Sequence, residues 1–366
     1  MGLYRFVLSA LVVLFHTGSI STPAGYSAVF GFYLLSGYLI PLAIERNYGL
    51  SRHGVTRYYG NRVLRILPLY AFFLILTAAL LSWHGSATFQ FSEKTVHILP
   101  DTSGYGLVEI GHELLFNAFI GVSNTGAVYV LNGFPKLVPQ AWSLVVEFTF
   151  YALAPLLLIL ARSGNLRRHV PVYGLLLLSL GFALYSGHIG LDFQTYRYRS
   201  TFGSFYIFML GFFAYLYRDR IPVPFIPRIT PTILLLAYLI FVIFVNNGTL
   251  VESQIYWALS LQFVITVAGM AHSNPPSRLD RRLGHLSYGI FVGHFCVALL
   301  MSIVSADHTH FELLKGSFGA FGSLSFGIWC LMFTILAAYF AHKYIENWID
   351  RLRDKVRGHV VQYGGA

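Results

Sequence analysis

Residues 64–83 read LRILPLYAFFLILTAALLSW, a run in which Arg65 is the only charged residue. A helix needs about 20 mostly apolar residues to cross the hydrocarbon core of a bilayer, and this run is long enough. The run therefore predicts a transmembrane helix, and the rest of the chain can be searched for others like it.

The composition of the whole chain agrees with a membrane location. Hydrophobic residues make up 56% of the 366 residues and charged residues only 11%, whereas a soluble domain carries about 25% charged residues. A soluble protein of this length needs more charge to cover its surface. The composition therefore argues against one or two soluble domains and indicates a polytopic membrane protein.

About ten apolar segments are long enough to be spans. Turn-forming stretches such as Asn246-Asn247-Gly248 and Pro275-Pro276 separate them. The predicted spans are Leu3–Ile20, Tyr26–Glu45, Leu64–Trp83, Ala141–Ala161, Val170–Gly187, Thr201–Tyr217, Pro231–Asn246, Ser253–His272, Gly284–Val304 and Ser317–Lys343. The sequence thus predicts an all-α fold with about ten transmembrane helices.

Basic residues are distributed unequally between the loops, although the formal net charge of the chain is +10. Alternate loops hold most of the lysines and arginines. The loops between them hold only Lys94, Lys136, Arg197, Arg199 and Lys315. Because basic loops stay in the cytoplasm, both termini are predicted to be cytoplasmic, as an even number of spans requires.

Charge within a span is costly and commonly functional, and three ionisable residues stand out. Arg5 and His16 share the first span, and Glu147 lies in the fourth. At 1.5 Å per residue, His16 lies roughly 6 Å and Glu147 roughly 9 Å below the outer face. We therefore expect that the two can meet, with Glu147 orienting His16 as a general base. The alternative is a histidine that only hydrogen-bonds between packed helices.

Five motifs follow one another on the predicted spans. They are RFVLSALVVLFH at 5–16, FGFYLLSGYLI at 30–40, RVLRILPLY at 62–70, WSLVVEFTFY at 142–151 and LGHLSYGIFVGH at 283–294. Together and in this order they resemble the acyltransferase-3 family of membrane acyltransferases. The resemblance covers roughly Arg5 to Glu346, with the departure that Asn347 stands where the family ending usually has proline.

The resemblance implies a fold of about ten helices and an activity. Family members use cytosolic acyl-CoA, usually acetyl-CoA, as a co-substrate, and they acylate hydroxyl groups of sugars, lipid-linked glycans and similar acceptors. The pair Arg5 and His16, separated by ten residues, matches the activity signature of the family. The resemblance therefore implies an O-acetyltransferase of a bacterial inner membrane, acting on an extracytoplasmic or lipid-linked glycan without a permanently bound cofactor.

The donor would meet a basic cluster. Coenzyme A carries several phosphate charges, and Arg57, Arg62 and Arg65, with Arg5 at the same end of the membrane, can contact them. The resemblance associates Arg65 and its neighbours with the donor, and Tyr70 is a further donor-binding candidate. His16 would then act on the thioester, either as a general base or as a nucleophile in an acyl-histidine relay.

Other polar residues are candidates with a structural alternative. Those that can line the site are Ser36, Gly37, Trp142, Ser143, Tyr288 and His294. Small residues such as Ser36 and Gly37 also permit close contact between membrane helices. Arg197 and Arg199 can hold an anionic acceptor or cap a helix. The scattered histidines show no metal-ligand spacing, so no metal site is expected.

The predicted domain organisation is simple. Residues 1–346 form one transmembrane domain, residues 347–366 a basic cytoplasmic tail, and no appended soluble domain is expected. The expected partners are acyl-CoA, a sugar or glycan acceptor and the lipid bilayer, and no nucleic acid. Two other functions stay open: a proton-coupled transporter or flippase, which also uses intramembrane Arg, His and Glu, and a non-catalytic membrane subunit.

Overall fold

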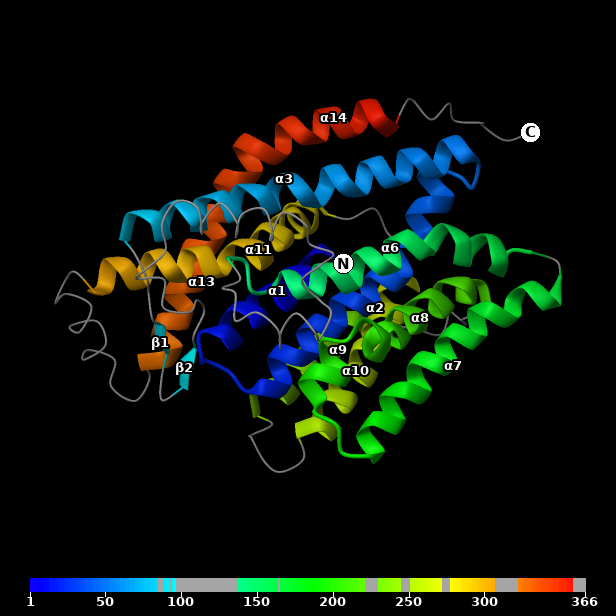
Figure 1. Ribbon diagram of the computed structural model, residues 1–366, viewed down its shortest axis with the longest axis horizontal. Helices are drawn as coiled ribbons and strands as arrows, with labels where there is room; N and C mark the ends of the chain where they lie inside the picture. Colours follow the sequence, from blue (N-terminus) through cyan, green and yellow to red (C-terminus); the bar gives the residue numbers. More distant parts are fainter. Residues whose placement is uncertain are drawn as a thin grey trace.

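The predicted apolar segments fold as helices in the computed structural model (Figure 1). The structure describes residues 1–84, 89–91, 94–96, 137–163, 165–220, 230–244, 251–271, 277–306 and 322–357. The α-helices are α1 Gly2–His16, α2 Thr22–Asn47, α3 Arg52–His84, α6 Ala141–Ala161, α7 Leu166–His188, α8 Thr201–Leu216, α9 Thr230–Phe244, α10 Val251–Ala271, α11 Arg278–Ala306, α13 Gly322–Ala341 and α14 Asn347–Arg357.

The remaining elements are short. Two π-helices, η2 (Gln194–Tyr198) and η6 (His342–Glu346), and a 3₁₀ turn, η3 (Arg218–Arg220), join longer helices. Two strands, β1 (Phe89–Phe91) and β2 (Lys94–Val96), pair in antiparallel fashion. Each predicted span overlaps one α-helix in the described residues, so the prediction of a helical fold is confirmed.

Six helical stretches are long and apolar enough to cross a membrane: Thr22–Asn47, Arg52–Leu80, Ala141–Ala161, Arg167–His188, Arg278–Met301 and Leu324–Asp354. Shorter apolar helices lie at Gly2–His16, Thr201–Leu216 and Thr230–Val242. These stretches mark an integral, multi-pass membrane protein. The number of ten spans and the cytoplasmic position of the termini stay predictions.

Glycines bring α2 and α8 into backbone contact. A Cβ atom at Gly37 would lie 2.1 Å from the carbonyl oxygen of Phe208, and one at Gly211 would lie 2.1 Å from that of Leu34. Neither helix can carry a side chain here, as is common where membrane helices pack closely. Gly37 therefore serves the contact between helices, and its prediction as a site-lining residue is corrected.

Helices α1 and α11 also lie side by side. A Cβ atom at Gly284 would lie 3.0 Å from the Cα atom of Gly2, and the Leu3 amide donates a 2.9 Å hydrogen bond to Asp280. This close start lets the two helices stay together over the length of α1. At the far end of α1, His16 consequently faces His294 in the middle of α11.

Helix α3 is longer than the predicted span. It begins at Arg52, twelve positions before Leu64, and its 33 residues correspond to about 50 Å, against about 30 Å for a hydrocarbon core. Helix α14 packs along it (Figure 1), with Ile349 only 4% exposed and Arg353 hydrogen-bonded to Asn61 at 3.4 Å. The described part of the predicted tail is therefore a helix docked on α3.

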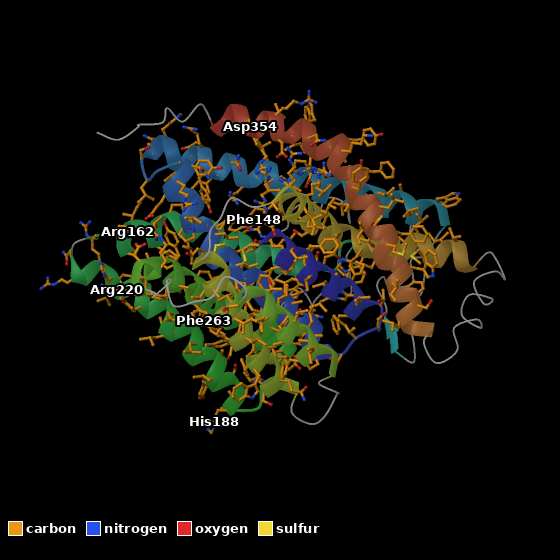
Figure 2. The ribbon with its side chains drawn as sticks, turned by 180° about the vertical axis from the view of Figure 1, so that it is seen from behind. Phe148, Arg162, His188, Arg220, Phe263 and Asp354 are labelled. Carbon is orange, nitrogen blue, oxygen red and sulfur yellow. The ribbon has the colours of Figure 1, made fainter. Side chains whose placement is uncertain are left out.

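Arginines from two loops gather at one end of the bundle. Arg162 and Arg220 line the same small cavity, and Figure 2 shows them at one edge of the molecule, whereas His188 lies at the opposite end of α7. Glu45 of α2 pairs with Arg162 at 2.7 Å and with Arg218 at 3.8 Å. These contacts agree with the predicted placement of both loops on one side of the membrane.

Candidate active site

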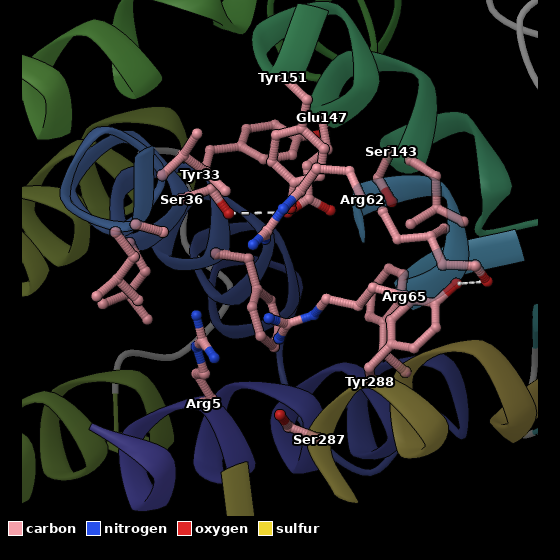
Figure 3. Close-up of a pocket in the computed structure, with 18 of the residues that line it drawn as sticks. Arg5, Tyr33, Ser36, Arg62, Arg65, Ser143, Glu147, Tyr151, Ser287 and Tyr288 are labelled. Atoms are coloured by element: carbon pink, nitrogen blue, oxygen red, sulfur yellow. Dashed lines mark hydrogen bonds between the residues drawn. The ribbon is translucent and has the colours of Figure 1, made fainter. Parts of the chain in front are cut away.

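A cavity of about 460 Å³ lies between α1, α2, α3, α6 and α11. Four arginines line it: Arg5 from α1, Arg46 from α2, and Arg62 and Arg65 from α3. Figure 3 shows the guanidinium groups of Arg5, Arg62 and Arg65 turned toward a common space. Glu147 of α6 is the one carboxylate among its lining residues. The cavity is therefore strongly electropositive.

Glu147 belongs to this cavity and not to the surroundings of His16. The Ser36 hydroxyl donates a 2.8 Å hydrogen bond to Oε1 of Glu147, and the Tyr151 hydroxyl donates to the same oxygen (Figure 3). Helix α6 packs against α2, α7 and α8, while α1 packs against α2, α11 and α13. The predicted pairing of Glu147 with His16 is wrong, because similar depth did not make the two helices neighbours.

Arg62 is a buried cation. The residue is only 7% exposed. Its guanidinium carbon lies 5.6 Å from the ring centre of Tyr58 and 5.8 Å from that of Tyr151. Its Nε has no hydrogen-bond partner in the described part of the chain. A buried charge is costly unless an opposite charge or a set of hydrogen bonds compensates it. The cavity is thus built to receive an anion.

His16 pairs with another histidine. Its Nδ1 lies 2.9 Å from the carbonyl oxygen of Val12 and 3.2 Å from Nε2 of His294. The two imidazole rings stack at 5.0 Å, and the ring of Phe295 lies 4.8 Å from that of His16. His294, predicted as a site-lining residue, is 2% exposed and contacts His16 directly. The structure therefore groups two predicted residues that lie far apart in the sequence.

Two phenylalanines line the cavity near the histidine pair. Phe32 and Phe291 both line the cavity, and their rings meet edge to face at 5.8 Å. The backbone carbonyl of Phe291 also accepts a 2.7 Å hydrogen bond from Nδ1 of His294. Phe291 thus contacts the cavity with its ring and the histidine pair with its backbone.

The other predicted residues divide between the cavity and its surroundings. Ser36, Ser143 and Tyr288 line the cavity, and the Tyr288 hydroxyl donates to the carbonyl of Ile66 at 2.9 Å. Three predicted residues are not among its lining residues: Arg57, Tyr70 and Trp142. Tyr70 is 2% exposed in the apolar core, and Trp142 packs on Tyr198 at 4.8 Å. Their direct roles at the site are therefore not supported by the geometry.

Arg197 lies in η2 and Arg199 directly follows it, and the two arginines have different contacts. Both guanidinium nitrogens of Arg197 that face Glu252 donate to its carboxylate, and one also donates to the Leu191 carbonyl at 3.0 Å. Arg197 is thus paired with a carboxylate, and its role as an acceptor-binding residue stays a prediction. The guanidinium carbon of Arg199 lies 6.0 Å from the ring centre of Trp142.

Five polar lining residues were not among the predicted site residues: Tyr33, Arg46, Asn47, Tyr151 and Ser287. Tyr33 precedes Ser36 by three positions and Tyr151 follows Glu147 by four, so each shares a helix face with a predicted residue. This spacing was a usable signal. The Tyr33 hydroxyl is buried without a partner in the described residues, so it remains available to a ligand.

Known proteins agree with this architecture. A family model described as an acyltransferase domain matches residues 2–343. An uncharacterized protein of Haemophilus influenzae is 30% identical over 153 residues, which span 42% of this chain and 56% of that protein. No solved structure matches significantly. Because the family model covers nearly the whole chain, including every helix from α1 to α13, this protein is a member of the acyltransferase-3 family of integral membrane acyltransferases.

Proposed function

We propose that this protein transfers an acyl group, preferably acetyl, from coenzyme A on the cytoplasmic side to a hydroxyl on the other side of the membrane. The observation that carries the proposal is the cavity lined by Arg5, Arg46, Arg62 and Arg65 with one carboxylate. Guanidinium groups bind phosphate by paired hydrogen bonds, and coenzyme A brings several phosphate charges. The acyl donor supplies the anion that the buried Arg62 lacks.

The donor has to reach His16 from this cavity. In the proposal, the phosphates stay with Arg62 and Arg65 while the thin pantetheine arm extends toward Phe32 and Phe291. Passing these rings brings the thioester beside the histidine pair. A narrow apolar passage also keeps water from the thioester, which favours transfer over hydrolysis.

The chemistry uses one nitrogen of His16. As general base, Nε2 takes the proton of the acceptor hydroxyl while the hydroxyl oxygen attacks the thioester carbonyl carbon. The carbon–sulfur bond then breaks, and the departing thiolate takes the proton back from Nε2. In the alternative relay, Nε2 itself attacks and an acyl-imidazole forms before the acceptor binds. Both routes need Nε2 unprotonated at the start.

The acceptor approaches from the end of α1 that carries His16. Arg199 lies over Trp142 there, next to the stacked rings of Tyr26 and Tyr198, whose centres are 4.1 Å apart. Aromatic faces and a guanidinium suit a sugar that carries an anionic group. This supports a glycan acceptor on the outer side of a bacterial inner membrane, on which membership of the family also bears.

The test compares purified wild type, His16→Ala and His188→Ala in detergent. His188 is an exposed histidine at the end of α7, so its substitution controls for the loss of a histidine. The probes are radiolabelled acetyl-CoA and a solubilised extract of membrane glycolipids, and coenzyme A release is measured together with label on the extract. We expect release by wild type and His188→Ala, and none by His16→Ala although it still binds acetyl-CoA.

Two results would contradict the proposal. Absence of acetyl-CoA binding by folded wild type would refute the donor assignment and favour a transporter, to be examined by proton-coupled uptake in liposomes. Full turnover by His16→Ala would leave the enzyme class intact and refute the chemistry assigned to His16.

A further inference from the structure

We infer that His294 is a positioning residue for the reaction: it holds the Nδ1–H of His16 and thereby keeps Nε2 of His16 aimed and free to act. The inference rests on the proposed function, because it assigns a role within the same acyl transfer. Depth along the helices suggested the carboxylate of Glu147 as the partner of His16. In this inference the partner is instead the neutral imidazole of His294 on α11.

The tautomer of His294 follows from its contacts. Its Nδ1 lies 2.7 Å from the carbonyl oxygen of Phe291, and a carbonyl can only accept, so this nitrogen carries the proton. Its Nε2 then has a lone pair, and it points at His16. Gln140 donates from Nε2 to the carbonyls of Val292, at 2.6 Å, and Phe291, at 3.3 Å. A second side chain thus holds the stretch of α11 that fixes His294.

The tautomer of His16 follows in the same way. Its Nδ1 faces two acceptors, the Val12 carbonyl at 2.9 Å and the Nε2 lone pair of His294 at 3.2 Å. One shared N–H satisfies both, which leaves Nε2 of His16 as the nitrogen with a lone pair. No described side chain hydrogen-bonds this Nε2. Phe15 and Phe295, with ring centres at 5.0 Å and 4.8 Å from that of His16, restrict rotation of the ring.

The same contacts also stabilise His16 when it is protonated. When Nε2 of His16 takes a proton, the Nδ1–H remains bonded to the two neutral acceptors, whose dipoles favour the cation. His294 cannot become a cation at the same time without giving up the lone pair that it offers.

The inference can be tested with two variants of His294. His294→Gln keeps an oxygen that can accept from His16, whereas His294→Met fills the same space without an acceptor. We expect His294→Met to lower kcat about tenfold or more, with the KM for acetyl-CoA and its binding affinity unchanged. His294→Gln should retain most of the rate.

A residue that only packs would behave differently. Its two variants would lose activity together with thermal stability, and they would lose it in any background. We expect instead that His294→Met has no further effect on the residual rate of a His16→Ala protein, because the two act as one unit. Equal rates for the Met and Gln variants, or a full rate for His294→Met, would overturn the inference. Inactivity of the wild type with acetyl-CoA would instead be a failure of the proposed function.

Discussion

The Ser36 hydroxyl donates a 2.8 Å hydrogen bond to the carboxylate of Glu147, and this contact joins α2 to α6 at the wall of the arginine-lined cavity. With the Tyr151 hydroxyl on the same oxygen, the carboxylate accepts two hydrogen bonds and faces a group of cations. Glu147 is thus placed to act as a built-in counter-ion for the arginines that line the cavity.

Glu147→Gln should therefore bind acetyl-CoA roughly several-fold more tightly than wild type, because one negative charge leaves the cavity while the arginines stay. Titration of the purified protein with acetyl-CoA measures this. Ser36→Ala is the matched control: it removes one hydrogen bond, keeps the charge and should leave the affinity close to that of wild type. Unchanged affinity with a lost kcat would return Glu147 to a role in the chemistry.

Arg62→Gln should weaken acetyl-CoA binding by about tenfold or more, since a charge-assisted contact to a phosphate contributes about 1.5–3 kcal/mol. Without ligand, the same variant should melt at a higher temperature than wild type, because a buried guanidinium lacking a carboxylate partner in the described residues is costly. Arg168→Gln, on the exposed start of α7, should change neither property. A melting temperature that falls would mean that Arg62 holds the fold together.

Glu252→Gln should lower the melting temperature in detergent and leave acetyl-CoA binding unaltered. The substitution leaves the guanidinium of Arg197, whose side chain is 7% exposed, without its charged partner, which costs about 1–3 kcal/mol. Asp219→Asn breaks a surface pair, in which the Asp219 side chain is 81% exposed, and should have almost no effect. Weaker binding of acetyl-CoA by Glu252→Gln would show that η2 supports the donor site.

Gly37→Ala should destabilise the protein by about 1–3 kcal/mol, because its methyl group would press on the Phe208 carbonyl across the contact between α2 and α8. Gly174→Ala tests the same substitution on α7, where nothing lies within 4 Å of the new Cβ atom. Thermal melting followed by size-exclusion chromatography compares the two. Equal melting temperatures would show that α2 and α8 can separate without cost.

Much of the fold was predictable, because apolar runs long enough to span a bilayer leave few alternatives. Residues 141–161 were predicted with the bounds that α6 shows. The start of α3 was missed, since residues 52–63 are too polar to be read as a span although they continue the same helix.

The site was predictable in its members and not in its pairs. Position along a helix gives a depth, and depth placed His16 and Glu147 at similar levels. Which helices are neighbours, and which face each one turns inward, depends on contacts such as that between Gly2 and Gly284, which no single span encodes. His294 was therefore recognised as a candidate, while the partner of His16 was sought on the wrong helix.

Helix α14 bears on how this protein should be handled. Shortening the chain after Glu346, a natural choice if the remainder were a loose tail, would uncover the side of α3 on which Ile349 and Arg353 rest. Helix α3 is longer than a hydrocarbon core is thick. Its first turns therefore extend beyond the apolar part of a detergent micelle, which would not shield them either. Affinity tags are better fused beyond residue 357, where they leave helix α14 in place.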